Sequence, residues 1–287
     1  MRICRYVLAF AILALLPSQR LHAQSAENSS DANNSGYFAD WFKRVDLTQA
    51  EQPHWVTPLA TTTARLEEEF RYDIFWQTNN SGITTETYGG AKGLELIPAR
   101  RVEVILVAPP AYIVHNNPAV KDGFGDWGLL VKYRILSSNE GHGNYILTAF
   151  FQATFPTGQY SNGATNSIIT PTIAYGKGFG DFDVQGTFGV TFPTGNAAKI
   201  GHSYLWNNAF QYHLGRRFWP EVEVNYTHFQ DGPNNGKTQV YLTPGLLIGR
   251  IHLWKRVALT VGGGFQIATT QFHTNNHNAI LSVRFPF

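Results

Sequence analysis

The chain has 287 residues, of which 43% are hydrophobic and 14% aromatic, with a formal net charge of +2 at pH 7. Without the three arginines of its first 23 residues, 19 of its 22 basic residues remain against 20 acidic ones, so a basic nucleic-acid footprint is not expected. Cys4 is the only cysteine and lies in the same stretch, which excludes disulfides, a thiolate nucleophile and cysteine-bound metal from the rest of the chain.

The first 23 residues have the pattern of a secretory signal peptide. Arg2 and Arg5 precede the apolar run Val7 to Leu16, and a small-residue site follows, so we place the cleavage after Ala23. The run is too short to cross a membrane as a helix, and no later run reaches the ~20 apolar residues that such a helix needs. We therefore expect no helical anchor.

Residues 24–63 are predicted to form a periplasmic extension. Residues 24–35 are rich in Ser, Asn and Asp and predict no regular structure. Phe38, Trp41, Phe42 and Val45 then follow at helical spacing, so residues 36–47 are either a short amphipathic helix or a collapsed loop with aromatic side chains. As a helix, this segment would lie on the periplasmic leaflet or enter the mouth of a barrel.

From Ala64 onward the sequence alternates between apolar and polar residues. The clearest example runs from Asp181 to Gly195, where Phe182, Val184 and Phe188 share one face and Asp183 and Gln185 share the other. Such alternation also suits a soluble sandwich, but a barrel is favoured because about twelve such segments follow one another with almost no helical periodicity. The predicted strands are 64–77, 84–98, 101–114, 124–138, 144–157, 166–177, 181–194, 202–214, 219–230, 237–250, 256–270 and 277–287.

The connections between these segments alternate in length. Short turns such as 98–101 and 177–180 alternate with longer loops rich in Asn, Gly and Ser, such as 115–123 and 158–166. Short periplasmic turns and longer outer loops are typical of outer-membrane proteins. The predicted fold class is therefore all-β, an antiparallel transmembrane β-barrel in the bacterial outer membrane, spanning residues 64–287. The final strand, with Phe285 and Phe287, is the expected signal for the barrel-assembly machinery.

Two motifs resemble a known family. Gly123-Phe-Gly-Asp126 leads into a strand and a hairpin that ends in Phe155-Pro-Thr-Gly158, and a second Phe-Pro-Thr-Gly occurs at Phe192 to Gly195. These residues resemble the outer-membrane proteins of the family named after the meta-pathway of phenol degradation. The resemblance covers the barrel and implies a channel or transporter, for hydrophobic or aromatic compounds. It carries over no binding residues.

Charged side chains of both signs are predicted on the inward face of the strands. Such groups must line water or pair with one another, because the other face meets lipid. Because the periplasmic half of the lumen would then hold seven acids against four bases, an open channel should prefer cations. Closure of the barrel should also place Arg284 beside Glu67 or Glu69. The expected lumen-lining set is Glu67, Glu69, Arg71, Asp73, Glu95, Glu103, Lys132, Arg134, Asp183, Glu221, Glu223 and Arg284.

The predicted function is passive passage of small solutes, with outer-membrane lipid as the surrounding partner and no cofactor. A structural or loop-binding barrel is the alternative, followed by a lipid-acting enzyme. The enzyme is disfavoured because His202 and Ser203 point to opposite faces and His213 is ~30 Å from Ser203 at strand rise. His273 and His277 flank a turn-forming Thr-Asn-Asn, so no metal site is expected there.

Overall fold

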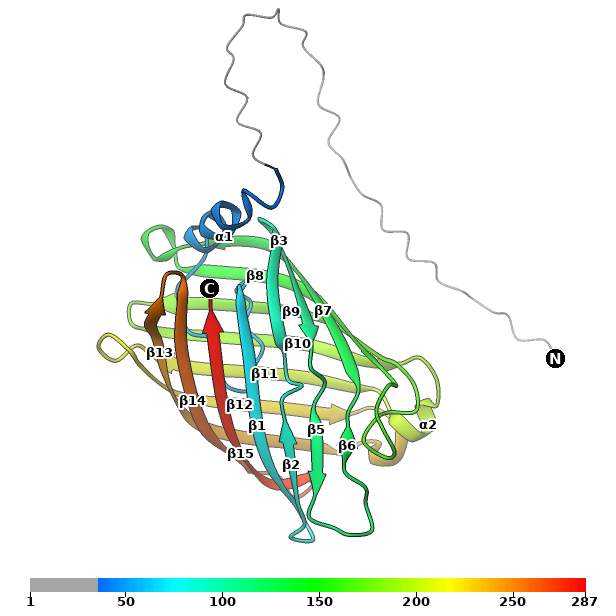
Figure 1. Ribbon diagram of the computed structural model, residues 1–287. Helices are drawn as coiled ribbons and strands as arrows, with labels where there is room; N and C mark the ends of the chain where they lie inside the picture. Colours follow the sequence, from blue (N-terminus) through cyan, green and yellow to red (C-terminus); the bar gives the residue numbers. More distant parts are fainter. Residues whose placement is uncertain (1–35) are drawn as a thin grey trace, which may run out of the picture. The chain divides into compact units, whose positions relative to one another are not determined.

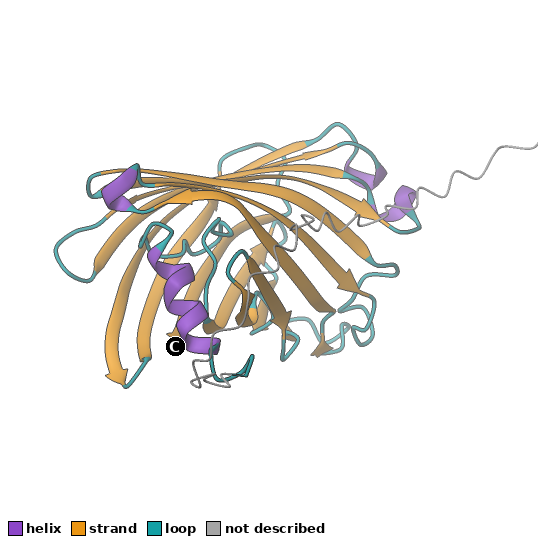
Figure 2. Cartoon of the chain, turned by 90° about the horizontal axis from the view of Figure 1, so that it is seen from above, coloured by secondary structure: helices purple, strands orange, loops and turns teal. Residues whose placement is uncertain are grey.

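The alternating segments form one antiparallel sheet that closes into a barrel in the computed structural model, which describes residues 36–287 (Figures 1 and 2). The predicted signal peptide, its cleavage site and the irregular stretch 24–35 lie outside the described residues. The helices are α1 (Trp41–Ala50), α2 (Ala197–Ile200) and the 3-10 turns η1 (Glu140–His142) and η2 (Gly232–Asn234). The strands are β1 (Glu69–Asn79), β2 (Thr84–Tyr88), β3 (Gly93–Ala99), β4 (Val102–Val107), β5 (Tyr112–His115), β6 (Gly123–Phe124), β7 (Trp127–Ser138), β8 (Tyr145–Phe155), β9 (Ile168–Phe179), β10 (Phe182–Pro193), β11 (Ser203–Tyr212), β12 (Phe218–Phe229), β13 (Thr238–Trp254), β14 (Val257–Ala268) and β15 (Asn275–Pro286).

Twelve strands make up the wall, because three of them are interrupted and count as two elements each: β2 with β3, β4 with β5, and β6 with β7. Glycines cause the first interruption. Gly89, Gly90 and Gly93 have positive φ values of 79°, 75° and 88°, and a Cβ on Gly90 would lie 2.5 Å from the backbone nitrogen of Ala111. The predicted fold and strand number are confirmed.

Pairing of β1 with β15 closes the barrel. Arg284 lies opposite Arg71 in this register, while Glu69 lies opposite Pro286. The expectation that Arg284 faces Glu67 or Glu69 is therefore wrong. The reason is that β1 begins at Glu69 and not at Ala64, because residues 64–68 leave the wall and run inside the barrel.

The outer face of the barrel is apolar. Side chains with even numbers on β11, such as Trp206 and Phe210, are half-exposed on the outside, whereas inward Gln211 is fully buried. A closed barrel with an apolar exterior is the fold of outer-membrane proteins, since lipid tolerates no open sheet edge. Among residues 36–287, no helix is both long and apolar enough to cross a membrane.

The amphipathic segment forms a helix, although α1 begins at Trp41 rather than at residue 36. Trp41 and Val45 pack on Leu66 and Ile97 at the end of the barrel where the C-terminus also lies (Figure 1). Phe38 stays 82% exposed. This end is the periplasmic one in the predicted topology, because its turns are the short ones.

Candidate functional site: a plug inside the barrel

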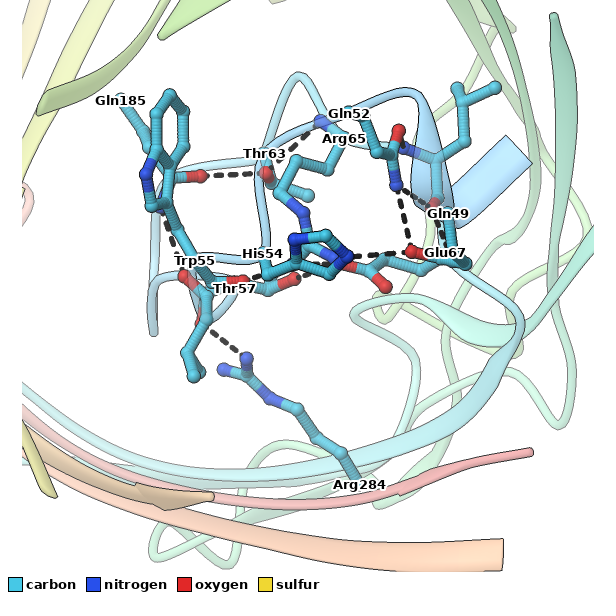
Figure 3. A network of polar contacts seen from close by, with 12 residues as sticks. Gln49, Gln52, His54, Trp55, Thr57, Thr63, Arg65, Glu67, Gln185 and Arg284 are labelled. Atoms are coloured by element: carbon cyan, nitrogen blue, oxygen red, sulfur yellow. Dashed lines mark hydrogen bonds and ion pairs between the residues drawn. The ribbon is translucent and has the colours of Figure 1, made fainter. Parts of the chain in front are cut away.

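Residues 51–68 connect α1 to β1 by running into the barrel and back, and we call them the plug. Figure 3 shows this stretch surrounded by the strands of the wall. All of its side chains are buried except four: Glu51 and His54 at the periplasmic end are exposed, as is Ala60, and Thr62 is half-buried. The body of the plug is therefore sealed within the lumen, while its tip at Ala60 is accessible to solvent.

Apolar side chains hold the plug at two places where the wall has glycines. Trp55 lies over Gly176, whose missing Cβ would be 2.4 Å from the indole ring. Leu59 lies on a second glycine surface, made by Gly245, Gly262 and Gly264, where added Cβ atoms would be 2.5, 2.8 and 2.7 Å from its side chain. Both side chains belong to one buried cluster with inward apolar residues of the wall, which are Ile105, Leu130, Ile146, Phe150, Ala174, Trp219 and Leu247.

Carboxylates of the wall bind peptide N–H groups of the plug. Glu223 accepts hydrogen bonds from Ala60 N at 2.7 Å and Thr61 N at 2.5 Å, and Glu221 accepts one from Leu59 N at 3.1 Å. The plug has no regular secondary structure, so its buried peptide groups need partners outside the plug backbone. Glutamates on β12 supply them, and a charged acceptor makes each bond stronger than a neutral one.

Cations of the wall bind the carbonyl groups of the same stretch. Arg71 donates to Pro58 O at 3.3 Å and to Leu59 O at 2.5 Å. Arg284, next to it across the seam, donates to Pro58 O at 2.9 Å and also to Thr57 O. The two arginines share the carbonyl of Pro58, and each binds one further carbonyl of the same turn, so the acceptors of the plug hold this like-charge pair at the closure of the barrel.

A second set of contacts holds the returning half of the plug. Arg65 pairs with Glu67 at 2.8 Å and donates to the carbonyl of Trp55, so it ties the two halves together. Lys132 donates to Arg65 O at 3.0 Å and pairs with Glu103 at 3.1 Å. Gln185 of β10 accepts a hydrogen bond from the Thr63 hydroxyl, with the two side-chain oxygens 2.6 Å apart (Figure 3).

All twelve residues predicted to line the lumen are inside the barrel, each at most 6% exposed. Glu67 belongs to the plug and not to a strand. Arg134 binds Thr48 O of α1 at 2.8 Å, and Asp183 accepts from Gln185 at 3.0 Å. Arg71 pairs with Asp73 at 2.7 Å, and Glu69 lies opposite Glu95 on the neighbouring strand. In this structure these charges contact the plug, α1 or one another, except Asp183, which is bonded by Gln185 of the wall. Whether they line a conducting path stays a proposal.

A contact between His54 and Glu140 holds the plug at its periplasmic entrance. His54 donates its backbone N–H to Glu140 at 2.5 Å, and its ring nitrogen Nδ1 lies 2.9 Å from the other carboxylate oxygen. Burial raises the pKa of the Glu140 carboxyl, but the hydrogen bonds from His54 outweigh that effect and leave the pKa below its ordinary value. Glu140 lies in the η1 turn, outside the membrane-spanning strands.

The histidines considered for chemistry are engaged elsewhere. His202 pairs with Asp231 at 2.6 Å, and His213 stacks on Trp219 with ring centroids 4.0 Å apart. His277 stacks on Phe265. Within residues 36–287, no group of three or more His, Cys, Asp or Glu side chains is arranged to hold a metal ion. The absence of enzymatic activity stays a prediction.

A belt of uncharged polar side chains was not anticipated from the sequence. It consists of one residue on each strand from β10 to β15: Thr187, Asn207, Asn225, Thr243, Gln266 and Asn278. Hydrogen bonds of 3.1–3.4 Å link them through Asn225, which is bonded to Asn207, Thr243 and Gln266. Asn225 also donates to Thr61 Oγ1 at 3.4 Å. The alternation of the strands placed these residues on the inner face, but only the pairing register shows that they meet.

Comparisons with known proteins support the fold. No protein-family model and no curated protein matches the chain. Among solved structures, an outer-membrane channel from Pseudomonas putida F1 is similar, with a TM-score of 0.58 and 15% identity over 81% of this chain and 100% of that one. OmpT, an outer membrane protein of Vibrio cholerae, covers 76% of this chain and 95% of its own at 8% identity, but a TM-score of 0.30 carries no argument. The chain thus shares its fold with an outer-membrane channel, and the resemblance to the phenol-pathway family agrees at the level of fold.

Proposed function

We propose that the protein is an outer-membrane channel for passive passage of small solutes, closed by its own plug and opened when the plug is released. The observation that carries this proposal is the way the wall binds the plug: arginines and glutamates from β1, β12 and β15 bind its peptide groups. Those contacts are polar, so water can replace them when the plug moves. Both ends of the plug lie at the periplasmic rim.

The accessible tip indicates from which side a solute would reach the plug. Ala60 is exposed at the turn of the plug, while the plug residues between it and the rim are buried, except Thr62 and His54. Solute from outside would reach the plug first and cross only after the plug moves. The similar channel from Pseudomonas putida supports this reading through its fold, and the family resemblance adds hydrophobic or aromatic compounds as candidate solutes.

Single-channel recording in planar bilayers tests the proposal. The parent should show a small, mostly closed conductance, and a barrel lacking residues 37–66 should conduct continuously. Glu221→Gln with Glu223→Gln weakens the three hydrogen bonds that the plug donates to these carboxylates and should increase the open time without removing any chain.

Glu86→Gln is the matched control, because Glu86 lies on β2 and bonds Tyr88 instead of the plug. It should conduct like the parent. If the deleted barrel is folded, as judged by its heat-modifiable migration on gels, and still conducts no more than the parent, the channel proposal is wrong.

A further inference from the structure

An amide side chain lies on the outer face of the barrel, where the wall meets lipid. Asn208 of β11 has the parity of Trp206 and Phe210, which are 50% and 40% exposed, so it points outward. It is the sixth of the ten residues of β11. At the rise and tilt of a membrane strand it lies ~10–12 Å in height from either end of β11. Asn208 is therefore near the middle of the membrane.

Only one side of this amide has a partner. Its oxygen Oδ1 accepts a hydrogen bond from the Tyr175 hydroxyl at 2.6 Å, and that hydroxyl accepts one from Trp206 Nε1 at 3.0 Å. Among residues 36–287 the amide nitrogen Nδ2 finds no acceptor. An unpaired donor in hydrocarbon is strongly unfavourable. Lipid ester carbonyls lie at the edges of a hydrocarbon core ~30 Å thick, too far away to accept from it.

The wall makes room for this polar cluster. Gly186 of β10 is the cross-strand partner of Asn208, and a Cβ there would lie 2.6 Å from the Tyr175 hydroxyl oxygen and 2.7 Å from Asn208 Oδ1. Exposed side chains near the middle of other strands, such as Val131 and Phe151, are apolar. The cluster is thus a local exception in the exterior, and polar groups facing lipid are typical of contacts between membrane proteins.

An apolar groove of about 330 Å³ adjoins the cluster. Asn208, Trp206 and Phe210 line it on β11, and Val224 lines it on β12. Beside the groove, the Phe188 ring of β10 is 50% exposed and pairs across the strands with Trp206. The same face therefore carries a hollow and an exposed ring next to it. A surface that binds a copy of itself needs both, because each copy must fill the hollow of the other.

We propose that this face binds a second copy of the chain, in a two-fold symmetric dimer centred on Asn208. An amide has donors and an acceptor with two lone pairs, so each Nδ2 can donate to Oδ1 of the partner's Asn208 while Tyr175 keeps its own bond. An acyl chain would fill the groove but offers no acceptor. Any other protein would have to bring an acceptor to the same depth, whereas a second copy has one there by symmetry.

Energy transfer between labelled barrels in phosphatidylcholine vesicles tests the proposal. The only cysteine, Cys4, lies in the predicted signal peptide, so Ser161→Cys places a single label on the exposed loop between β8 and β9. Donor-labelled and acceptor-labelled barrels should show transfer that persists when more lipid is added, because a dimer stays together as the proteins spread apart. Transfer that falls to the level of random proximity would mean a monomer with lipid in the groove, and would overturn the proposal.

Two variants locate the contact. Asn208→Leu removes both bonds between the copies and should raise the dissociation constant of the dimer about tenfold, since each hydrogen bond between membrane segments contributes roughly threefold. Val224→Trp fills the groove but keeps the amide, and should raise the constant as well. Leu281→Ala is the matched control, because Leu281 is exposed on β15, four strands from β11, and its truncation should leave the constant unchanged.

Heat-modifiable migration on gels shows which variants are folded. Parent-like dissociation constants for both Asn208→Leu and Val224→Trp would place the contact on another face and refute the proposal. The dilution experiment needs no substitution in the groove, so it decides the question even if one variant does not assemble. Conduction plays no part in these measurements, and the dimer and the channel can therefore fail separately.

Discussion

Trp55→Ala should release the plug more than any other single change in its body. The indole is 3% exposed and rests on Gly176, where it lies nearer to the Cβ position of that glycine than the side chain of Ile146 does. Truncating a buried Trp to Ala costs about 3–5 kcal/mol. If that cost falls on the docked plug alone, the equilibrium between docked and released plug shifts roughly a hundred- to a few thousand-fold, at tenfold per 1.4 kcal/mol.

Trypsin cleavage reports that shift directly. Arg65 is 1% exposed and lies inside the barrel, so trypsin can cut after it only when the plug has left the lumen. The cleavage rate after Arg65 should rise with the population of released plug, in parallel with the open time in bilayer recordings.

Trp254→Ala is the matched control for this experiment. Trp254 is 65% exposed at the periplasmic end of β13 and does not contact the plug, so its truncation should change neither readout. The reasoning is refuted if Trp55→Ala leaves cleavage after Arg65 at the rate of the parent while the barrel stays folded, because the packing on Gly176 would then contribute nothing to docking.

Three further predictions concern other parts of the chain. Asp126→Asn should loosen loop 156–167 by about 1.5–3 kcal/mol in hydrogen exchange, because the Asp126 carboxylate accepts from Thr157 N, Gly158 N and Ala164 N at 3.1, 2.9 and 2.7 Å. Asp122→Asn is the control, because the Asp122 carboxylate accepts from His115 N at 2.8 Å, outside that loop; it should leave the loop unchanged, and equal effects of the two variants would contradict this account. The lowered pKa of Glu140 means that its link to His54 is present above the ordinary carboxyl pKa and is lost as pH falls through the lowered value, so acid should increase the open time in the parent more than in Glu140→Gln. Deletion of Phe287 should reduce the amount of assembled barrel, and normal accumulation of the heat-modifiable form would show that the terminal residue is not the assembly signal.

The architecture was predictable because the side chains of each wall strand alternate between apolar and polar every second residue. The sequence alone therefore shows which face each side chain takes, as for Phe182, Asp183 and Phe188. An even number of such strands with alternating loop lengths then fits one topology, the up-and-down barrel. The plug has no such period. Trp55 and Leu59 lie in a stretch of Pro, Thr and Ala that shows no periodicity. The glycines against which they pack, Gly176 and Gly262, are more than a hundred residues away in the sequence.

The same limit applies to the inward charges. Alternation predicted Glu223 and Arg284 on the inner face, where both are buried. The expected cation preference, however, counts inward acids and bases as if all of them faced water. Both bind peptide groups of the plug instead. Cation preference is therefore a prediction for the barrel after the plug has left, when these side chains are released, and not for the closed state.

The hydrogen bonds that hold the plug also fix when it can dock during biogenesis. Leu59 is bound by a residue 162 positions later in the chain, and Pro58 by one 226 positions later, close to the C-terminus. Synthesis proceeds from the N-terminus, so the plug emerges long before either partner exists. The complete set of hydrogen bonds to the plug can therefore form only when both β12 and the last strand, β15, are in the wall.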